Sequence, residues 1–117
     1  MLQGHLKLDN LIIVVDQNGL QLDDYVKNIT GLTNIKSIFE AFGFNTIKID
    51  GNNFNEIDSA FTALSSNKPN IIIAETIKGK GISFMENRVE WHSKKLNDEE
   101  YMRALKELEE QEVIINE

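Results

Sequence analysis

The stretch NIIIAETIKGKG, residues 70–81, decides how the rest of the chain is interpreted. Its first half is an unbroken apolar run with three consecutive isoleucines, which is typical of a strand buried on both faces of a parallel sheet. Its second half repeats Lys-Gly twice, so flexible backbone and ammonium groups follow the strand directly. Ligands of open parallel sheets bind beyond the carboxyl ends of the strands. Residues 78–81 are therefore the first place to look for a binding site.

Two more strands and two helices precede this stretch. The run NLIIVVD, residues 10–16, predicts a strand buried on both faces, and FNTIKID, residues 44–50, predicts a shorter one. The segments between the strands carry apolar residues at helical spacing, namely Ile35, Ile38, Phe39 and Phe42, then Ile57, Ala60, Phe61 and Leu64. The order β-α-β-α-β predicts right-handed crossovers and a parallel α/β sheet covered by helices on both faces.

Local signals mark where the helices begin and end. Gly43 directly follows the first predicted helix, at the position where a glycine in the left-handed conformation commonly ends a helix. Asn53 and Glu56 have the spacing of a capping box, and so do Asn97 and Glu100. The second box opens a last helix with the apolar positions Tyr101, Met102, Leu105 and Leu108. We therefore expect a single domain, residues 1–117, with a βαβαβ core (1–77), a long ordered loop containing a short helical turn (78–96) and a helix (97–117).

Composition excludes several classes of function. The chain has no cysteine, which removes disulfide scaffolds, thiolate zinc sites and thiol nucleophiles. A net charge of −7 argues against nucleic-acid binding. We find no apolar run of membrane-spanning length and no signal-peptide core, so we expect no membrane partner and a cytoplasmic location. Residues 78–96 are nevertheless basic, with five Lys or Arg against two Glu, as binding of an anionic small molecule would require.

Two polar clusters are the candidate site. One follows the first strand, at Asp16, Gln17, Asn18 and Gly19, and the other is Lys78 to Gly81. If the strands are parallel, both lie at one edge of the sheet, where an amide oxygen and ammonium groups suit a metal–diphosphate. The plainer alternatives stay open: Asn18-Gly19 as an ordinary turn, and His92, beside Trp91, as a surface or capping residue.

Four stretches resemble the transketolases, most closely the N-terminal subunit of the two-chain type: GHLKLDNLIIVVDQNGLQ, AFGFNTIKIDG, IIIAETIKGKGISFMEN and VEWHSKKLNDEEY. The resemblance covers essentially the whole chain. It implies a three-layer parallel-sheet, Rossmann-like thiamine diphosphate-binding fold, present in part. It also implies transfer of two-carbon ketol units between sugar phosphates with thiamine diphosphate and Mg²⁺.

The resemblance assigns roles residue by residue. Asn18 matches the asparagine whose side-chain oxygen binds Mg²⁺, and Leu20 matches a residue whose backbone carbonyl is another ligand. Lys78 and Lys94 match lysines near the cofactor. His92 matches the active-site histidine, which is near the diphosphate and the reacting centre. A histidine there suits hydrogen bonding or proton transfer because it titrates near neutral pH.

Departures from the family pattern limit what this chain is expected to do. The Gly-Asp-Gly that opens the family's cofactor motif, with its Mg²⁺-binding aspartate, is not among the residues before Asn18. Ser93 replaces the usual glycine after the histidine, and Asp24 departs from the family's turn. We therefore expect the chain to need the remaining transketolase domains or subunit, in an oligomer. The alternatives are a non-catalytic βαβαβ scaffold and part of a related enzyme, such as 1-deoxyxylulose-5-phosphate synthase or a ketoacid dehydrogenase component.

Overall fold

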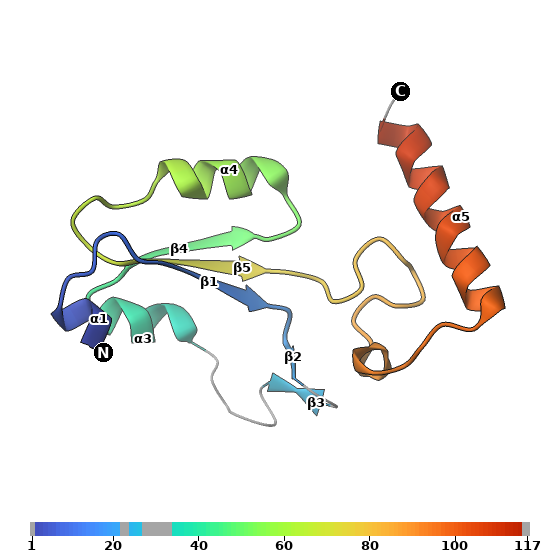
Figure 1. Cartoon of the computed structure of the whole chain (residues 1–117), viewed down its shortest axis with the longest axis horizontal. Coiled ribbons are helices and arrows are strands. Elements are labelled where there is room, and N and C mark those ends of the chain that lie inside the picture. The colour runs from blue at the N-terminus through green and yellow to red at the C-terminus, as the bar shows by residue number, and fades with distance from the viewer. Residues whose placement is uncertain (1, 22–23, 27–33, 116–117) are drawn as a thin grey trace.

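The computed structural model describes residues 2–21, 24–26 and 34–115, and Figure 1 gives the labels of the elements. The helices are α1 (Leu2–His5), α3 (Ile35–Ala41), α4 (Phe54–Thr62), the 3₁₀ turn η1 (Val89–His92) and α5 (Asp98–Ile115). The strands are β1 (Ile12–Gln17), β2 (Leu20–Gln21), β3 (Asp24–Tyr25), β4 (Asn45–Asp50) and β5 (Asn70–Glu75). The predicted alternation of strands and helices is confirmed, while α1 and the β2–β3 pair were not predicted.

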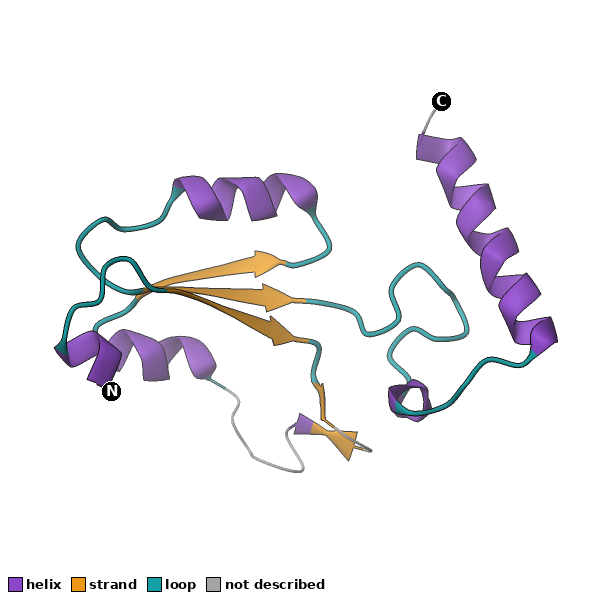
Figure 2. Cartoon of the chain, viewed as in Figure 1, coloured by secondary structure: helices purple, strands orange, loops and turns teal. Residues whose placement is uncertain are grey.

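The main sheet has three parallel strands in the order β1-β5-β4, as Figure 2 shows. The strand that opened the sequence analysis, β5, is central. Asn70 at its start pairs with Ile12 and with Asn45, and Glu75 at its end pairs with Gln17 and with Asp50. All three strands therefore end at the same edge, as a parallel arrangement requires.

Helices cover the two faces of this sheet and give it three layers (Figure 1). The α4 face is built from Ile49, Ala60, Ile72 and Ala74, with Ile47, Ile57 and Leu64 packed around them. The α3 face is built from Phe44, Ile71 and Ile73, with Ile13, Val15, Ile35, Phe39 and Phe42 around them. Because successive side chains of a strand alternate between faces, the run of isoleucines in β5 serves both cores.

The helix signals in the sequence are confirmed. Gly43 follows α3 with φ +83°, and its N–H donates to the Glu40 carbonyl at 2.9 Å. The N–H of Phe44 reaches the Phe39 carbonyl at 3.1 Å, and the two rings meet edge to face at 5.2 Å. This is a Schellman stop with its hydrophobic contact. Asn53 caps α4, where its side-chain oxygen accepts from the N–H groups of the first turn.

One prediction about the first strand is wrong. Residues 10–16 were expected to be buried on both faces, yet Ile12 and Val14 of β1 are 42% and 58% exposed. The strand lies at the edge of the sheet, and α4 packs over β4 and β5 instead of over β1. An unbroken apolar sequence shows that a strand tolerates burial on both faces. It does not show that another element of the chain packs against each face.

Six positions in three helices also differ from the predicted stripes. Ile38 of α3 and Phe61 of α4 are exposed, although their helical neighbours pack on the sheet. In α5 the residues expected to form the apolar face are exposed, namely Tyr101, Met102, Leu105 and Leu108, while Ala104 is buried. Each of these six apolar side chains keeps 36% or more of its surface exposed.

Residues 78–115, here called the C-terminal arm, extend away from the sheet (Figure 1). The radius of gyration is 17.6 Å, against roughly 13 Å for a compact domain of this length. Within the described residues, no helix combines the length and apolarity needed to cross a bilayer.

Candidate functional site

The two polar clusters lie at the same edge of the sheet, as predicted. The pairing of Gln17 with Glu75 places the ends of β1 and β5 side by side. Beyond this pair, the N–H of Thr76 donates to the Gln17 carbonyl at 3.4 Å, and the Thr76 hydroxyl donates to a carboxylate oxygen of Asp16. The exits of the first and last strands are thus tied together before they diverge.

Asn18 forms the turn that leads out of β1. Its side-chain oxygen accepts a hydrogen bond from the N–H of Leu20 at 2.9 Å, and Gly19 has φ +74°. The turn closes further where the N–H of Val26 donates to the Gly19 carbonyl at 3.0 Å. Asn18 is therefore a turn residue, and the turn hydrogen bond uses one lone pair of its side-chain oxygen. An amide oxygen has two lone pairs, so one remains to accept from or ligate another group.

The Lys-Gly repeat builds a close-packed turn. The N–H of Asn87 donates to the Lys78 carbonyl at 3.0 Å, and the N–H of Lys80 to the Ile77 carbonyl at 3.1 Å. Gly79 has φ +74°, and a Cβ at that position would lie 2.7 Å from the Met85 carbonyl oxygen. The side chain of Lys80 pairs with Glu86 at 3.5 Å, and Lys78 is half-buried. The glycine thus allows the chain to return against its own backbone.

The short helical turn that we expected somewhere within residues 78–96 lies at Val89–His92, as η1. The indole N–H of Trp91 donates to the Phe84 carbonyl at 3.1 Å, and the two rings are 5.5 Å apart. The ammonium of Lys94 lies 4.2 Å from the centre of the Trp91 ring and 2.5 Å from Glu100. That hydrogen bond, followed by the bond from the Asn97 N–H, lowers the pKa of Glu100. Lys94 therefore already has two partners within the arm, Trp91 and Glu100, whereas His92 is exposed.

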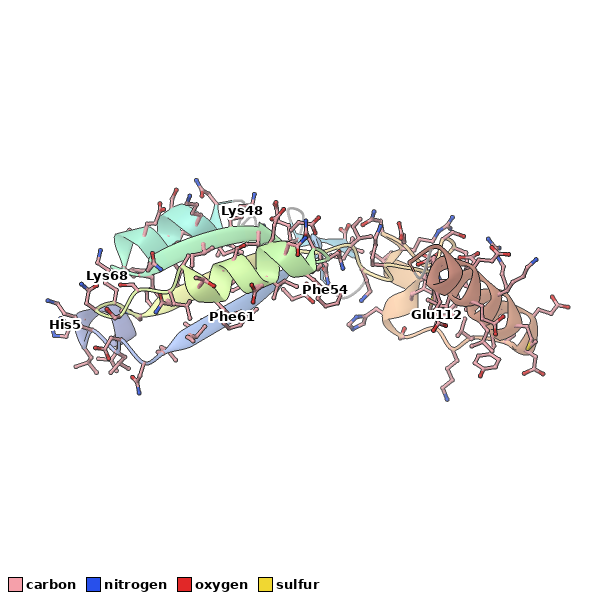
Figure 3. All side chains as sticks on the ribbon, turned by 90° about the horizontal axis from the view of Figure 1, so that it is seen from above. His5, Lys48, Phe54, Phe61, Lys68 and Glu112 are labelled. Carbon is pink, nitrogen blue, oxygen red and sulfur yellow. The ribbon has the colours of Figure 1, made fainter. Side chains whose placement is uncertain are left out.

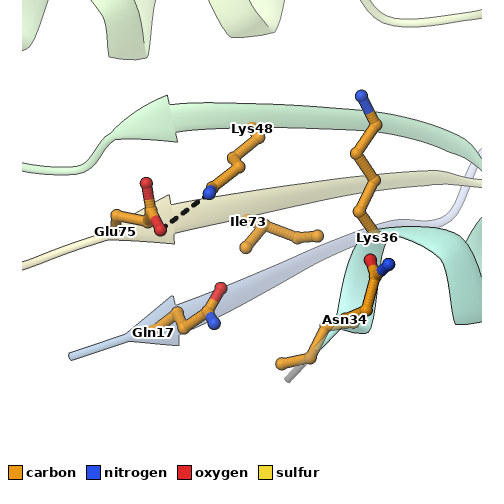
Figure 4. Close-up of a pocket in the computed structure, with 7 residues that line it drawn as sticks. Gln17, Asn34, Lys36, Lys48, Ile73 and Glu75 are labelled. Carbon is orange, nitrogen blue, oxygen red and sulfur yellow. Dashed lines mark ion pairs between the residues drawn. The ribbon is translucent and has the colours of Figure 1, made fainter. Parts of the chain in front are cut away.

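A cavity of about 100 Å³ opens at the carboxyl edge of the sheet, between the strands and α3. Figure 4 shows Lys48 reaching across β5 to Glu75, with an ammonium–carboxylate distance of 2.7 Å. Gln17, Asn34 and Lys36 complete its polar lining. Sequence reasoning had placed Gln17 in the first polar cluster but missed Asn34, Lys36, Lys48 and Glu75. The alternation within FNTIKID was the available signal, because it places Lys48 near the end of β4 on the face opposite Ile47 and Ile49.

Comparison with known proteins identifies the family. The family model described as the thiamine diphosphate binding domain of transketolase matches residues 1–112. The chain belongs to the transketolase family. A crystal structure of transketolase from Campylobacter jejuni superposes with a TM-score of 0.82 at 34% identity, covering 92% of this chain and 17% of that one. This agreement places the three-layer sheet within a transketolase thiamine diphosphate-binding domain.

Two relatives of this transketolase-family chain are themselves called subunits. The apulose-4-phosphate transketolase subunit of Actinobacillus succinogenes is 41% identical over 106 residues, which is 90% of this chain and 38% of that protein. The 6-deoxy-6-sulfo-D-fructose transketolase subunit SqwG of a Clostridium species is 39% identical over 113 residues, 95% of this chain and 41% of that protein. The chain thus spans about two-fifths of the length of these relatives.

Proposed function

We propose that this chain is the part of a transketolase that holds the diphosphate and Mg²⁺ of thiamine diphosphate during transfer of two-carbon ketol units between sugar phosphates. The observation that supports this most is the match of residues 1–112 to the cofactor-binding domain, combined with the meeting of the β1 and β5 exits at one edge. The cofactor supplies the carbanion chemistry of the reaction when it is bound.

The oxygen donors near Asn18 fit part of a Mg²⁺ site. Mg²⁺ prefers oxygen ligands in octahedral geometry. The side-chain oxygen of Asn18 keeps one lone pair beyond its turn bond, and the carbonyl of Leu20 is a second donor of the right kind. Among the described residues, no group of three or more histidine, aspartate or glutamate side chains forms a metal site. We infer that the remaining ligands come from the cofactor and from a segment that carries the family's Gly-Asp-Gly.

The cationic and hydrogen-bonding roles fall to three residues of the arm. Lys78 offers a positive charge to the diphosphate at the exit of β5. Lys94 offers a second positive charge, either while it stays paired with Glu100 or after it leaves Glu100 for the diphosphate. His92 is exposed on η1 and free to donate a hydrogen bond to substrate or to move a proton. We propose that a cytoplasmic oligomer brings these groups together with the remaining transketolase domains or subunit.

The test combines this chain with the remaining part of a split-type transketolase and measures ketol transfer to ribose 5-phosphate. Donors named for the relatives widen the panel beyond xylulose 5-phosphate to apulose 4-phosphate and 6-deoxy-6-sulfo-D-fructose, all of them anionic ketoses. We expect no sustained turnover from the chain alone and turnover from the combination. His92→Ala should lower kcat by about 100-fold or more, whereas His5→Ala, the chain's other histidine, should leave it unchanged.

Calorimetry with thiamine diphosphate and Mg²⁺ separates cofactor binding from a scaffold role. A scaffold is the second candidate because Asn18 and Lys94 both have local structural partners. In the combined protein we expect cofactor binding that Asn18→Ala weakens and that Asn55→Ala, an exposed change on α4, leaves intact. Absence of binding heat at millimolar ligand would favour the scaffold.

A further inference from the structure

The chain contains one Asn-Gly step, Asn18-Gly19, and one Asp-Gly step, Asp50-Gly51. Each step lies where a strand of the main sheet ends, after β1 and at the end of β4. Both strands end at the carboxyl edge, which faces the C-terminal arm (Figure 1 and Figure 3). Asparagine or aspartate before glycine is the pair in which a backbone nitrogen attacks the preceding side chain most readily, because glycine has no Cβ to hinder the approach. The chain therefore has two places where this reaction can be compared.

The side chains of the two steps make the same local hydrogen bond. The Oδ1 atom of Asn18 accepts from the N–H of Leu20 at 2.9 Å, and the Oδ1 atom of Asp50 accepts from the N–H of Asn52 at 2.8 Å. Each bond reaches the backbone two positions further on, which makes both turns Asx turns. A donor on this oxygen stabilises the negative charge that develops there when a nucleophile adds to the side-chain carbon. The two turns therefore present their side-chain carbonyl groups alike.

The glycines of the two steps differ. The N–H of Gly51 donates to the Glu75 carbonyl at 2.7 Å, and a Cβ at Gly51 would lie 2.6 Å from the Thr76 side chain. Gly19 is exposed, its N–H donates to no other described residue, and a Cβ there would meet nothing within 4 Å. A backbone nitrogen that donates a hydrogen bond must break that bond before it can react. Of the two glycine nitrogens, that of Gly19 is therefore the one available to attack.

We propose that Asn18-Gly19 is a site of spontaneous self-modification in the folded chain, where the asparagine is converted to aspartate and isoaspartate. The Gly19 nitrogen gives its proton to solvent, and its electron pair forms a bond to the side-chain carbon of Asn18. The bond from that carbon to Nδ2 then breaks, and Nδ2 takes up a proton and leaves as ammonia. Water opens the resulting cyclic imide at either of its carbonyl groups, which gives aspartate from one opening and isoaspartate from the other. Water is the only co-reactant.

The conversion alters the turn that carries the two proposed Mg²⁺ donors, and this consequence rests on the proposed function. Aspartate keeps an oxygen donor at position 18 but adds a negative charge. Isoaspartate carries the main chain through the side chain, which lengthens the backbone by a methylene group and shifts the Leu20 carbonyl relative to the oxygen donors at position 18. Mg²⁺ demands near-ideal octahedral geometry, so such a shift weakens its binding. A chain that ages before it meets the cofactor should therefore bind the cofactor more weakly.

Peptide mapping by mass spectrometry follows the conversion without cofactor or partner. The full chain and its Asp50→Asn variant, which has a second Asn-Gly step at the bonded glycine, are incubated at neutral pH, folded or in urea. In the folded variant we expect the Asn18 peptide to gain the mass difference between an amide and an acid at least about tenfold faster than the D50N peptide, because Gly51 must first give up its hydrogen bond. In urea the two steps should convert at equal rates. Equal rates in the folded variant would overturn the proposal.

The parent chain gives a second measurement, which does not depend on the folding of D50N. Chromatographic separation of isoaspartyl peptides should find isoaspartate at Asn18 and none at Asp50 in the folded parent. An intact Asn18 in the folded chain, after the chain in urea has converted, would overturn the proposal.

Ion exchange then tests the consequence for cofactor binding, because the converted chain carries an additional carboxylate that is ionised at neutral pH. The unconverted and isoaspartate fractions are each combined with the remaining part of a split-type transketolase and titrated with thiamine diphosphate and Mg²⁺ in a calorimeter. We expect the isoaspartate fraction to bind at least about tenfold more weakly. Equal affinity would contradict this consequence. Absence of binding by both fractions would count against the proposed function alone, because the conversion itself is measured without cofactor.

Discussion

Among single residues, Asn70 ties together the segments that meet at the amino end of the sheet. Its side chain is 1% exposed, and its oxygen accepts from the Asn45 amide at 2.8 Å and from the Ser65 N–H at 2.7 Å. Its amide donates to the carbonyls of Ser65 and Lys68 at 2.9 and 3.1 Å. Every bonding group of the buried amide is thus satisfied, which is what makes burial of a polar residue tolerable.

We therefore expect Asn70→Ala to lower the free energy of unfolding of the sheet by about 3 kcal/mol, because it leaves several buried partners unpaired. Asn67→Ala is the matched control, since Asn67 is exposed and bonds to the Ser65 side chain. Its effect should stay within about 0.5 kcal/mol. Urea denaturation followed by far-ultraviolet circular dichroism measures both. Equal stability of the two variants would show that the Asn70 network contributes nothing.

Gly79 is the second single residue with a sharp expectation. Its φ of +74° strains any other residue, and a Cβ there would also meet Met85 at 2.7 to 2.9 Å. Gly79→Ala should destabilise the arm by about 3 kcal/mol, from backbone strain and overpacking together. Gly19→Ala shares the φ of +74° but meets nothing within 4 Å, so strain alone should cost about 1 kcal/mol. Trp91, the chain's only tryptophan, reports on the arm by fluorescence.

At the scale of elements, the join between α5 and the rest of the arm depends on Glu107. Its carboxylate accepts from the N–H of Ser83 at 2.6 Å and from the Ser83 hydroxyl at 2.8 Å, and it pairs with Arg103 at 3.1 Å. The Ser83 N–H, then its hydroxyl, and then Arg103 lower the pKa of Glu107. Because the folded arm favours the ionised form, this stabilisation is present at neutral pH and is lost as the pH falls through the lowered pKa.

We expect the arm to loosen in acid, below the ordinary glutamate range of about pH 4.3. Glu107→Gln should weaken the arm at neutral pH and flatten its acid dependence, as measured by Trp91 fluorescence during titration. Some dependence should persist from Glu100, whose pKa is also lowered, mainly by Lys94. Glu110→Gln removes an exposed carboxylate 3.8 Å from Lys106 and should not alter the profile. Identical titrations of E107Q and the parent would contradict this assignment.

Elements with local signals were predictable from the sequence. The Gly43 stop, the Asn53 cap and the Asn97–Glu100 box are set by residues within one helical turn, and all three form in the structure. The exposure of Val14 and Phe61 was not predictable, because periodicity marks an apolar face without saying what covers it. An apolar helix or strand face has the same sequence pattern whether the element that covers it belongs to this chain or to another chain.

The candidate site was predictable in outline for the same reason. Parallel strands must end at one edge, so the meeting of the β1 and β5 exits followed from the order of elements. The pairing of Lys94 with Glu100 and the turn bond of Asn18 did not follow, because they depend on where η1 and the Asn18 turn set the side chains. The assignments of Asn18, Leu20, Lys78, His92 and Lys94 to cofactor and metal stay predictions.

At the scale of the whole molecule, the chain consists of a layered sheet and an arm that are stabilised separately. The sheet depends on its two apolar clusters, centred on β5. In the arm, α5 is bonded to the turn that follows β5: Gln111 donates to the Gly81 carbonyl at 2.8 Å, and Arg103 lies 4.7 Å from the Phe84 ring. Figure 1 shows α5 standing apart from the sheet layers. Such a molecule need not unfold as one cooperative unit.

We therefore expect two transitions on heating. The arm melts first, as reported by Trp91 fluorescence and by loss of the α5 helix signal in circular dichroism. The sheet layers melt second, as a later step in circular dichroism that the fluorescence does not show. Ser83→Ala should lower only the first transition, because it removes the hydroxyl bonds to Glu107 and Arg103. Ile72→Ala should lower the melting temperature of the second transition only. Because this isoleucine is buried, the substitution should reduce the free energy of unfolding of the sheet by about 2–5 kcal/mol. A single transition shifted by both substitutions would mean that the arm and sheet are coupled.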